Sequence, residues 1–180
     1  MIRLPALAVA ALLVLPPASL AASSQEYGLG DLGSLQIDLA PGWHVTRSPS
    51  GSGATISIEA AKPGSMQLLM TPLPGQPTDA EVREFAQHAA DALGPQSVEK
   101  SLAVKSLRGP QARGYYFKAT DPAPKPGEYR YLYQGAVRMR MIVVTFTVLY
   151  NDGAEDDAEA AVAAVRGMKL RPVPLKHSAL

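Results

Sequence analysis

The sequence has no cysteine and only three histidines, His44, His88 and His177. Without cysteine there can be no disulfide bond, thiol nucleophile or thiolate metal ligand, so the fold must be stabilised by its core. Serine catalysis would require a histidine base oriented by a carboxylate, and no motif of the sequence places one. We therefore expect no catalytic residue, no metal site and no cofactor, which indicates a protein that is not an enzyme.

The chain also lacks an excess of charge. Apart from Arg3, its 16 basic residues are balanced by 16 acidic residues. Binding to nucleic acid depends on basic residues that displace counterions from phosphates, and no basic surplus is available for this. We therefore expect no nucleic-acid partner.

Long apolar runs are confined to the start of the chain. Arg3 precedes an apolar run at 4–15, and Pro16-Pro17 and small residues follow, which is the pattern of a secretory signal peptide covering residues 1–21. The run is shorter than the roughly 20 residues that cross a bilayer. We therefore expect a periplasmic protein without a membrane anchor, with secretion to the medium as the alternative.

Residues 28–33, GLGDLG, match the G-x-G-x-x-G pattern of dinucleotide-binding folds through Gly28, Gly30 and Gly33. In that site the glycines lie between a buried strand and a helix, whose N-terminus meets the pyrophosphate. Here the residues that follow alternate as a strand does. The segment 22–33 is therefore interpreted as a flexible lead-in rather than a phosphate site.

Alternating apolar residues and β-branched composition predict a series of strands. They lie at 35–40, 43–45, 55–59, 66–73, 98–104, 113–120, 128–133 and 136–150. Thr78 to Glu81 forms a capping box that begins a helix, which Gly94-Pro95 ends. Its apolar stripe consists of Val82, Phe85, Ala86, Ala89 and Leu93. A second helix is predicted from about 154 to 166, with the stripe Ala158, Ala161, Val162 and Val165.

The segment 142–150 is apolar on both of its alternating faces. A strand of this kind is covered on both sides, which predicts an antiparallel sheet flanked by helices. We therefore expect an α+β protein with a single α/β/α sandwich domain over residues 34–170, followed by a disordered tail at 171–180.

The stretch QEYGLGDLGSLQIDLAPGWHV resembles the opening of PsbP-like and DcrB-like domains. In those domains a Tyr-Gly lead-in precedes an amphipathic strand that ends in a Pro-Gly-Trp corner, here Pro41-Gly42-Trp43. The resemblance extends over 27–170 by element order, and the corner is its one mark at the level of sequence. It implies an α/β/α sandwich without a common catalytic site, used in binding and assembly.

One constellation is a candidate contact surface. If Gln134-Gly135 is a hairpin turn, then Tyr129, Tyr131, Arg138 and Arg140 share one face of the sheet. Stacked phenol and guanidinium groups form a rigid polar surface for a protein partner or an anionic ligand. The same pairs can simply stabilise an exposed sheet, and a bulge at Gly135 would move the residues to other faces.

A second candidate set, Glu84, His88 and Asp91, lies on one polar helix face at a spacing that could hold a metal. Polar helix faces commonly collect such residues, so a solvated surface is the preferred interpretation. The sequence as a whole predicts an exported, non-enzymatic protein that binds a protein partner or assists envelope assembly. A small-ligand carrier with a pocket between sheet and helix is the first alternative, and a hydrolase is the second.

Overall fold

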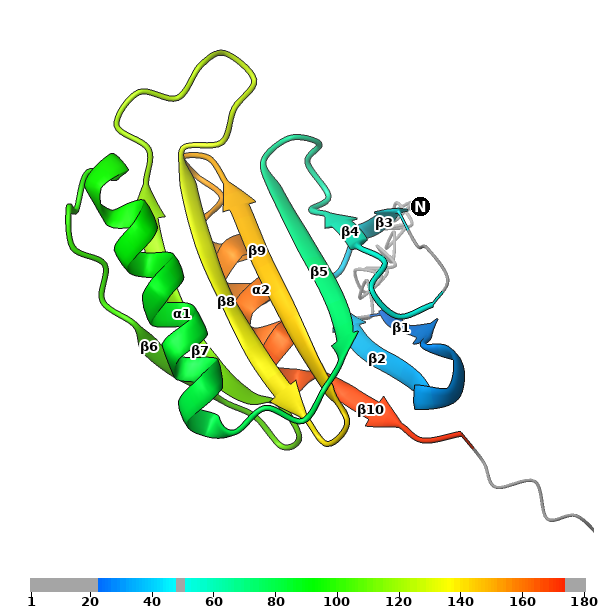
Figure 1. Cartoon of the computed structure of the whole chain (residues 1–180). Helices are drawn as coiled ribbons and strands as arrows, with labels where there is room; N and C mark the ends of the chain where they lie inside the picture. Colours follow the sequence, from blue (N-terminus) through cyan, green and yellow to red (C-terminus); the bar gives the residue numbers. More distant parts are fainter. Residues whose placement is uncertain (1–22, 48–50, 174–180) are drawn as a thin grey trace, which may run out of the picture.

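The computed structural model describes residues 23–47 and 51–173, which form three layers (Figure 1). The middle layer is a seven-stranded antiparallel sheet in the order β3-β4-β5-β9-β8-β7-β6. Helix α1 (Asp79–Leu93) lies on one face, over β7 and β8, and helix α2 (Glu155–Gly167) lies on the other. Helix α2 also contacts β2 of a three-stranded sheet with the order β1-β2-β10. The predicted α+β sandwich with helices on both faces is confirmed.

The strands of the large sheet are β3 (His44–Arg47), β4 (Ile56–Glu59), β5 (Met66–Pro74), β6 (Lys105–Arg108), β7 (Arg113–Thr120), β8 (Tyr131–Met139) and β9 (Ile142–Tyr150). Those of the small sheet are β1 (Ser23–Gly28), β2 (Ser34–Leu39) and β10 (Lys169–Arg171). Short 3-10 turns occur at Gly30–Leu32 and Gly94–Gln96.

Helix α1 begins where its capping box predicts. The Thr78 hydroxyl accepts a hydrogen bond from the Glu81 amide, and the Glu81 carboxylate accepts one from the Thr78 amide at 2.6 Å. Two of the unpaired donors at the helix start are thereby satisfied. Val82, Ala86 and Ala90 are buried on the sheet. The predicted stripe is wrong for Phe85, which is 48% exposed.

Helix α2 buries the four predicted residues, Ala158, Ala161, Val162 and Val165. The Trp43 indole, at the Pro-Gly-Trp corner, is buried and donates a hydrogen bond to Asp157 Oδ1 at 3.1 Å. The corner between β2 and β3 is therefore attached to the first turn of α2, which places the small sheet against this helix.

The expected flexible lead-in is wrong in its described part. Residues 23–28 form β1, which pairs with β2 along its whole length, and Tyr27 and Leu29 are buried. Gly28 ends β1, whereas Gly30 and Gly33 lie in the connection between these strands, where Gly33 has φ 98°. A Cβ at Gly33 would overlap the Arg171 carbonyl of β10. Residues 29–33 are thus a tight hairpin connection, and the element after them is a strand, as predicted. The predicted signal peptide at 1–21 and residues 174–180 of the predicted tail, His177 among them, lie outside the described residues.

The predicted strand at 98–104 is also wrong. The strand lies later, at β6, and the preceding residues form a loop in which Lys100 has φ 59°. Leu102 packs from this loop against a small core of Ala90, Phe117 and Ala119 under α1. The apolar residues at 98–104 therefore include a residue that packs into a core, but the segment does not pair as a strand. Within the described ranges, no helix is long and apolar enough to cross a membrane.

Candidate functional site

Gln134-Gly135 is neither a hairpin turn nor a bulge. Both residues lie inside β8, which pairs without a register shift with β7 on one side and β9 on the other. The hairpin turn is at Arg140-Met141, because Met139 pairs with Ile142. The predicted shared face of tyrosines and arginines is therefore wrong.

Gly135 is required inside β8 because β7 and β8 approach each other closely there. A Cβ at Gly135 would overlap the Tyr115 carbonyl oxygen and would lie 2.6 Å from the Tyr116 Cβ. A Cβ at Gly114 would likewise overlap the Ala136 carbonyl oxygen. Glycine inside a strand commonly marks such an approach. The sequence Gln-Gly resembles a turn only when the neighbouring strand is unknown.

The four predicted surface residues are separated as a result. Tyr131 and Arg138 are an odd number of positions apart on one strand, so their side chains point to opposite faces. They also lie at opposite ends of β8, roughly 23 Å apart at about 3.3 Å per residue. Tyr129 and Tyr131 line one hollow, and Arg138 and Arg140 line another. Whether either pair contacts a partner stays a prediction.

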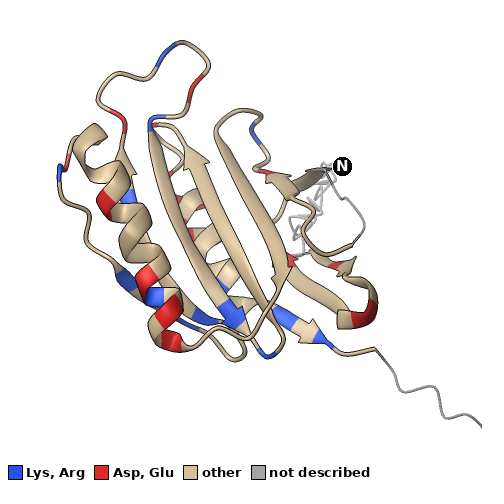
Figure 2. Cartoon of the chain, viewed as in Figure 1, with Lys and Arg blue, Asp and Glu red and all other residues tan. Residues whose placement is uncertain are grey.

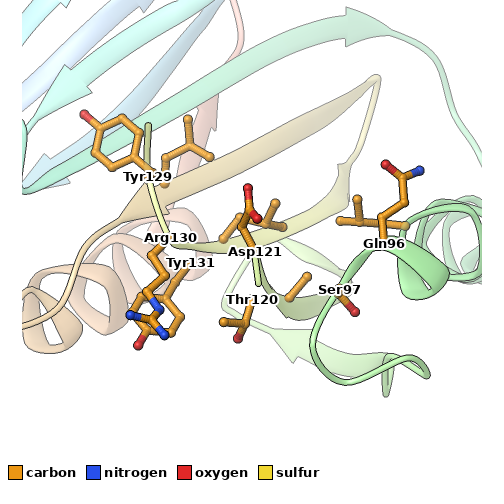
Figure 3. Close-up of a pocket in the computed structure, with 11 residues that line it drawn as sticks. Gln96, Ser97, Thr120, Asp121, Tyr129, Arg130 and Tyr131 are labelled. Carbon is orange, nitrogen blue, oxygen red and sulfur yellow. The ribbon is translucent and has the colours of Figure 1, made fainter. Parts of the chain in front are cut away.

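The tyrosine end forms a polar hollow of about 230 Å³ (Figure 3). Gln96 and Ser97, which follow α1, lie across from Arg130 and Tyr131. The Tyr131 hydroxyl donates a hydrogen bond to Asp152 at 2.7 Å, and Arg130 lies 3.7 Å from the same carboxylate. The main polar groups on this side therefore already have protein partners, which favours a structural role.

Beneath this hollow, tyrosine rings stack between the sheet and α2. The rings of Tyr131 and Tyr133 each lie within 5.5 Å of the Tyr150 ring, centroid to centroid. The Lys118 ammonium is 5.3–5.9 Å from all three centroids, and the Tyr150 hydroxyl beside it raises the Lys118 pKa. Burial, and then a 2.6 Å hydrogen bond to Glu159, raises the Tyr133 pKa. Such cation–π and ring contacts join three strands to α2.

The opposite face of the sheet has a partly uncovered region. Because α1 lies over β7 and β8, Figure 1 shows β5 and β9 without a helix in front of them. Val143, Thr145 and Thr147 of β9 are half-buried there, whereas the alternate residues of β9 are buried against α2. The expectation that both faces of this strand are covered is therefore wrong at β9.

A groove runs along α1 at the border of this uncovered region. It consists of two adjoining hollows of about 250 Å³ and 300 Å³, which share Phe85 and Thr145. Leu73, Pro77, Val82, Ala136 and Val143 line the first hollow with Glu81, and Thr55, Leu69, Thr71, Gln134, Gly135, Phe146 and Thr147 line the second. Phe85 is 48% exposed and Leu73 is 37% exposed. We call these lining residues the α1 groove.

The α1 groove was missed from the sequence for a specific reason. Phe85 follows the helical period and therefore resembles a core residue. The sheet, however, extends beyond the reach of α1, and the helix buries Val82 and Ala86 instead. Only the strand order shows that Phe85 faces the uncovered β9, because β9 is inserted between β5 and β8.

The candidate metal set does not converge. His88 Nε2 lies 3.9 Å from Glu84, and both side chains are largely exposed. Asp91 instead accepts a hydrogen bond from Gln87 at 2.8 Å. Across the described chain, no group of three or more histidine or carboxylate side chains is placed to hold a metal ion.

No protein-family model and no curated protein sequence matches the chain. Solved structures with a similar fold include the following two. Cyanobacterial PsbP (CyanoP) from Synechocystis sp. PCC 6803 has a TM-score of 0.51 and 12% identity, over 88% of this chain and 99% of its own. LpqN, described as involved in cell envelope biogenesis of Mycobacterium tuberculosis, has a TM-score of 0.52 and 17% identity, over 84% of this chain and 92% of its own. At these identities the likeness shows the fold, and the predicted PsbP-like fold is confirmed.

Proposed function

We propose that this chain is an exported, non-enzymatic protein of the bacterial envelope that binds a partner protein through the α1 groove. The observation that carries the proposal is the exposed Phe85 side chain beside the uncovered strands β5 and β9. Exposed apolar groups gathered in a groove with a polar rim are typical of protein interaction sites. The groove combines both features.

The groove suits an apolar side chain of a partner segment. The hollow between Leu73, Phe85 and Val143 is lined almost wholly by apolar surface. Burying a leucine-sized or phenylalanine-sized side chain there contributes about 1.5–3 kcal/mol. The hydroxyl groups of Thr71, Thr145 and Thr147 in the adjoining hollow can hydrogen-bond the polar atoms of the same segment. The partner chemistry we propose is therefore an extended or helical segment with one or two apolar anchors.

Different observations support the proposed export and the proposed lack of catalysis. The signal-peptide pattern at 1–21 favours export to the periplasm, and the fold is shared with LpqN, a protein described as involved in cell envelope biogenesis. The polar groups of the tyrosine hollow are engaged with one another, and the described histidines are surface residues. These observations support a binding role over a hydrolase.

A small-ligand carrier is the second candidate, because the groove lies between α1 and the sheet, where such a site is expected. Each hollow is at or below the roughly 300–1,000 Å³ typical of small-molecule pockets. Helix α1 packs closely on the sheet through Ala86 and Ala90, both at most 1% exposed. The dimensions therefore favour a protein side chain over an enclosed ligand.

Site-specific photo-crosslinking tests the proposal. A photoreactive amino acid replaces Phe85 in one variant and Val98, an exposed residue outside the groove, in another. We expect one discrete protein adduct from position 85 and none of that mass from position 98. The adduct is then identified, and the purified partner is titrated against the folded chain.

Equal crosslinking from both positions would contradict the proposal, as would a purified partner that binds a Phe85→Ser variant unchanged. Displacement of a fluorescent apolar ligand from the groove, with no protein adduct, would instead support the ligand carrier.

A further inference from the structure

Three arginines lie side by side at one end of the large sheet. Arg108 of β6 pairs with Arg113 of β7, and Arg113 pairs with Arg138 of β8. Directly opposed residues of an antiparallel sheet have Cβ atoms about 4.5–5.5 Å apart, and like charges in this position are destabilising. The row therefore places three guanidinium groups in an arrangement that the fold itself does not favour.

Ion pairs among the described residues engage only one arginine of the row. Only Arg138 has an acidic neighbour, Asp79 of α1, with Nε and Oδ1 3.9 Å apart. That carboxylate also accepts a 2.7 Å hydrogen bond from the Tyr115 hydroxyl. The ion pairs of the described ranges include neither Arg108 nor Arg113. The row is thus available to an anion from outside the chain.

A fourth arginine occupies a strained position beside the row. Arg140 is at the tip of the β8–β9 hairpin with φ 26°, in a turn where glycine or asparagine is usual. Backbone strain of this kind costs on the order of 1–3 kcal/mol and is concentrated at functional sites. A cation is therefore kept at the hairpin tip at some expense in stability.

Arg140 and two arginines of the row, Arg113 and Arg138, surround one hollow of about 570 Å³, which is also lined by Pro110, Gln111, Leu170 and Pro172. Lys169 and Arg171 of β10 add cations at the same end, as Figure 2 shows in blue. Two apolar side chains flank the hollow. Met141, next to Arg140, is 46% exposed, and Val173, next to Pro172, is 51% exposed.

We propose that this arginine end binds the phosphate groups of an anionic phospholipid membrane, with Met141 and Val173 entering the interface. The guanidinium groups provide paired donors for phosphate oxygens, and each basic residue near an anionic surface strengthens binding about 5-fold. The chain is nearly neutral as a whole, with a net charge of +1, so this end determines its orientation on the membrane. The proposal does not depend on a partner in the α1 groove.

The exposed apolar side chains favour a membrane over a free phosphate ion. A soluble anion gains nothing from Met141 or Val173, whereas an apolar side chain beside cations is typical of proteins that lie at a lipid interface. Carboxylates lie at both ends of the sheet, Asp79 and Glu81 in the first turn of α1 and Glu155, Asp156 and Asp157 in the first turn of α2 (Figure 2). The orientation is therefore set by the arginines and the exposed apolar side chains.

Vesicle flotation tests the proposal with a chain of residues 22–180, which contains every described element and omits the apolar run at 4–15. Vesicles of phosphatidylcholine with phosphatidylglycerol are compared with vesicles of phosphatidylcholine alone. We expect binding to the anionic vesicles that falls with added salt. The Arg113→Gln/Arg140→Gln variant should bind about 25-fold more weakly, from about 5-fold per arginine.

The control variant Lys62→Gln/Lys125→Gln removes the same charge from exposed loops at the opposite end and should stay within about 2-fold of the parent chain. A Met141→Ser variant, which keeps every charge, should also bind more weakly. Thermal unfolding verifies folding, and Arg113→Gln should be as stable as the parent or more so, because like charges are removed.

Equal loss of binding in the two charge variants would overturn the proposal, because net charge alone would then explain it. Equal binding to both vesicle types would overturn it as well. Calorimetric binding of inorganic pyrophosphate without binding to anionic vesicles would assign the arginine end to a soluble phosphate instead of a membrane.

Discussion

The two faces of the seven-stranded sheet differ in how fully they are covered, and two adjacent leucines of β5 show the difference. Leu68 points toward α2, has no exposed surface and lies in the large core. Leu69, the next residue, points to the other face, where it is half-buried and lines the α1 groove. Strand alternation thus divides one sequence into a fully buried face and a partly exposed face, to which we assign the proposed binding.

The large core forms on the α2 side because two layers meet there. Helix α2 and the small sheet together cover strands from β4 to β8. On the other side, α1 covers β7 and β8 over a small core of Ala90, Leu102, Phe117 and Ala119. Stability should therefore respond much more to substitutions on the α2 side than to substitutions at the groove.

The largest expected effect separates the two leucines. Leu68→Ala should lower the free energy of unfolding by about 2–5 kcal/mol, because it leaves a cavity in a close-packed core. Leu69→Ala should lower it by less than about 1.5 kcal/mol, since solvent and neighbouring side chains can fill the space. Denaturant unfolding measures both losses, provided that the two variants show the same dependence of stability on denaturant concentration. Equal losses would show that the two faces are not divided as described.

Gly135→Ala should destabilise the protein by about 1–3 kcal/mol through crowding of β7 against β8. The new Cβ would overlap the Tyr115 carbonyl oxygen, which belongs to the backbone and cannot rotate away. Gly28→Ala provides the control, because a Cβ at Gly28 would have nothing within 4 Å and Gly28 has no positive φ. A tolerated Gly135→Ala, measured by thermal unfolding, would argue against the close approach.

The pH dependence of stability at alkaline pH tests the burial of Tyr27 in the large core on the α2 side. Burial raises the Tyr27 pKa from 10.0 to about 12, and among the described residues its hydroxyl has no hydrogen-bond partner. The folded state holds the Tyr27 proton more tightly than the unfolded state does. The contribution of neutral Tyr27 to the free energy of unfolding is therefore complete below pH 10 and is lost as the pH rises from 10 to 12. Tyr27→Phe should reduce the loss of stability between pH 10 and 12 and leave the stability at neutral pH little changed. Parallel pH profiles of the two proteins would contradict this assignment.

The smallest effect concerns the wall of the groove. Thr78→Ala removes the hydroxyl that caps α1 and should cost about 1 kcal/mol. Thr78→Ser keeps the hydroxyl and should restore nearly all of that stability. Calorimetric unfolding of the pair measures the difference, and a Thr78→Ser variant as unstable as Thr78→Ala would show that the hydroxyl is not the cause.

Local patterns in the sequence predicted most of the elements. The capping box of α1, the apolar stripe of α2 and the covering of the sheet by a helix on each face depend on residues close in sequence or on composition. The pattern failed at Gly135, because the cause is a strand that lies beside it only in the folded chain. It also failed at 23–28, where pairing with β2 orders a polar segment.

The candidate surfaces depend even more on long-range register. Arg108, Arg113 and Arg138 become neighbours through the pairing of three strands, which no spacing along the sequence predicts. Phe85 becomes a groove residue because β9 lies between β5 and β8. The predicted tyrosine–arginine surface assumed a turn at Gln134-Gly135, and the structure instead places the tyrosines and the arginines at the two ends of β8.

The affinity of the crosslinked partner for Phe85→Ser and Val98→Ser variants tests the central claim most directly, because both replace an exposed apolar side chain. If the groove face is for binding, Phe85→Ser weakens binding at least about 10-fold, in line with the loss of an interface anchor. Val98→Ser leaves the affinity unchanged, and both proteins unfold at nearly the parent temperature. Unchanged affinity for Phe85→Ser, or equal weakening by both variants, would contradict the division between the two faces.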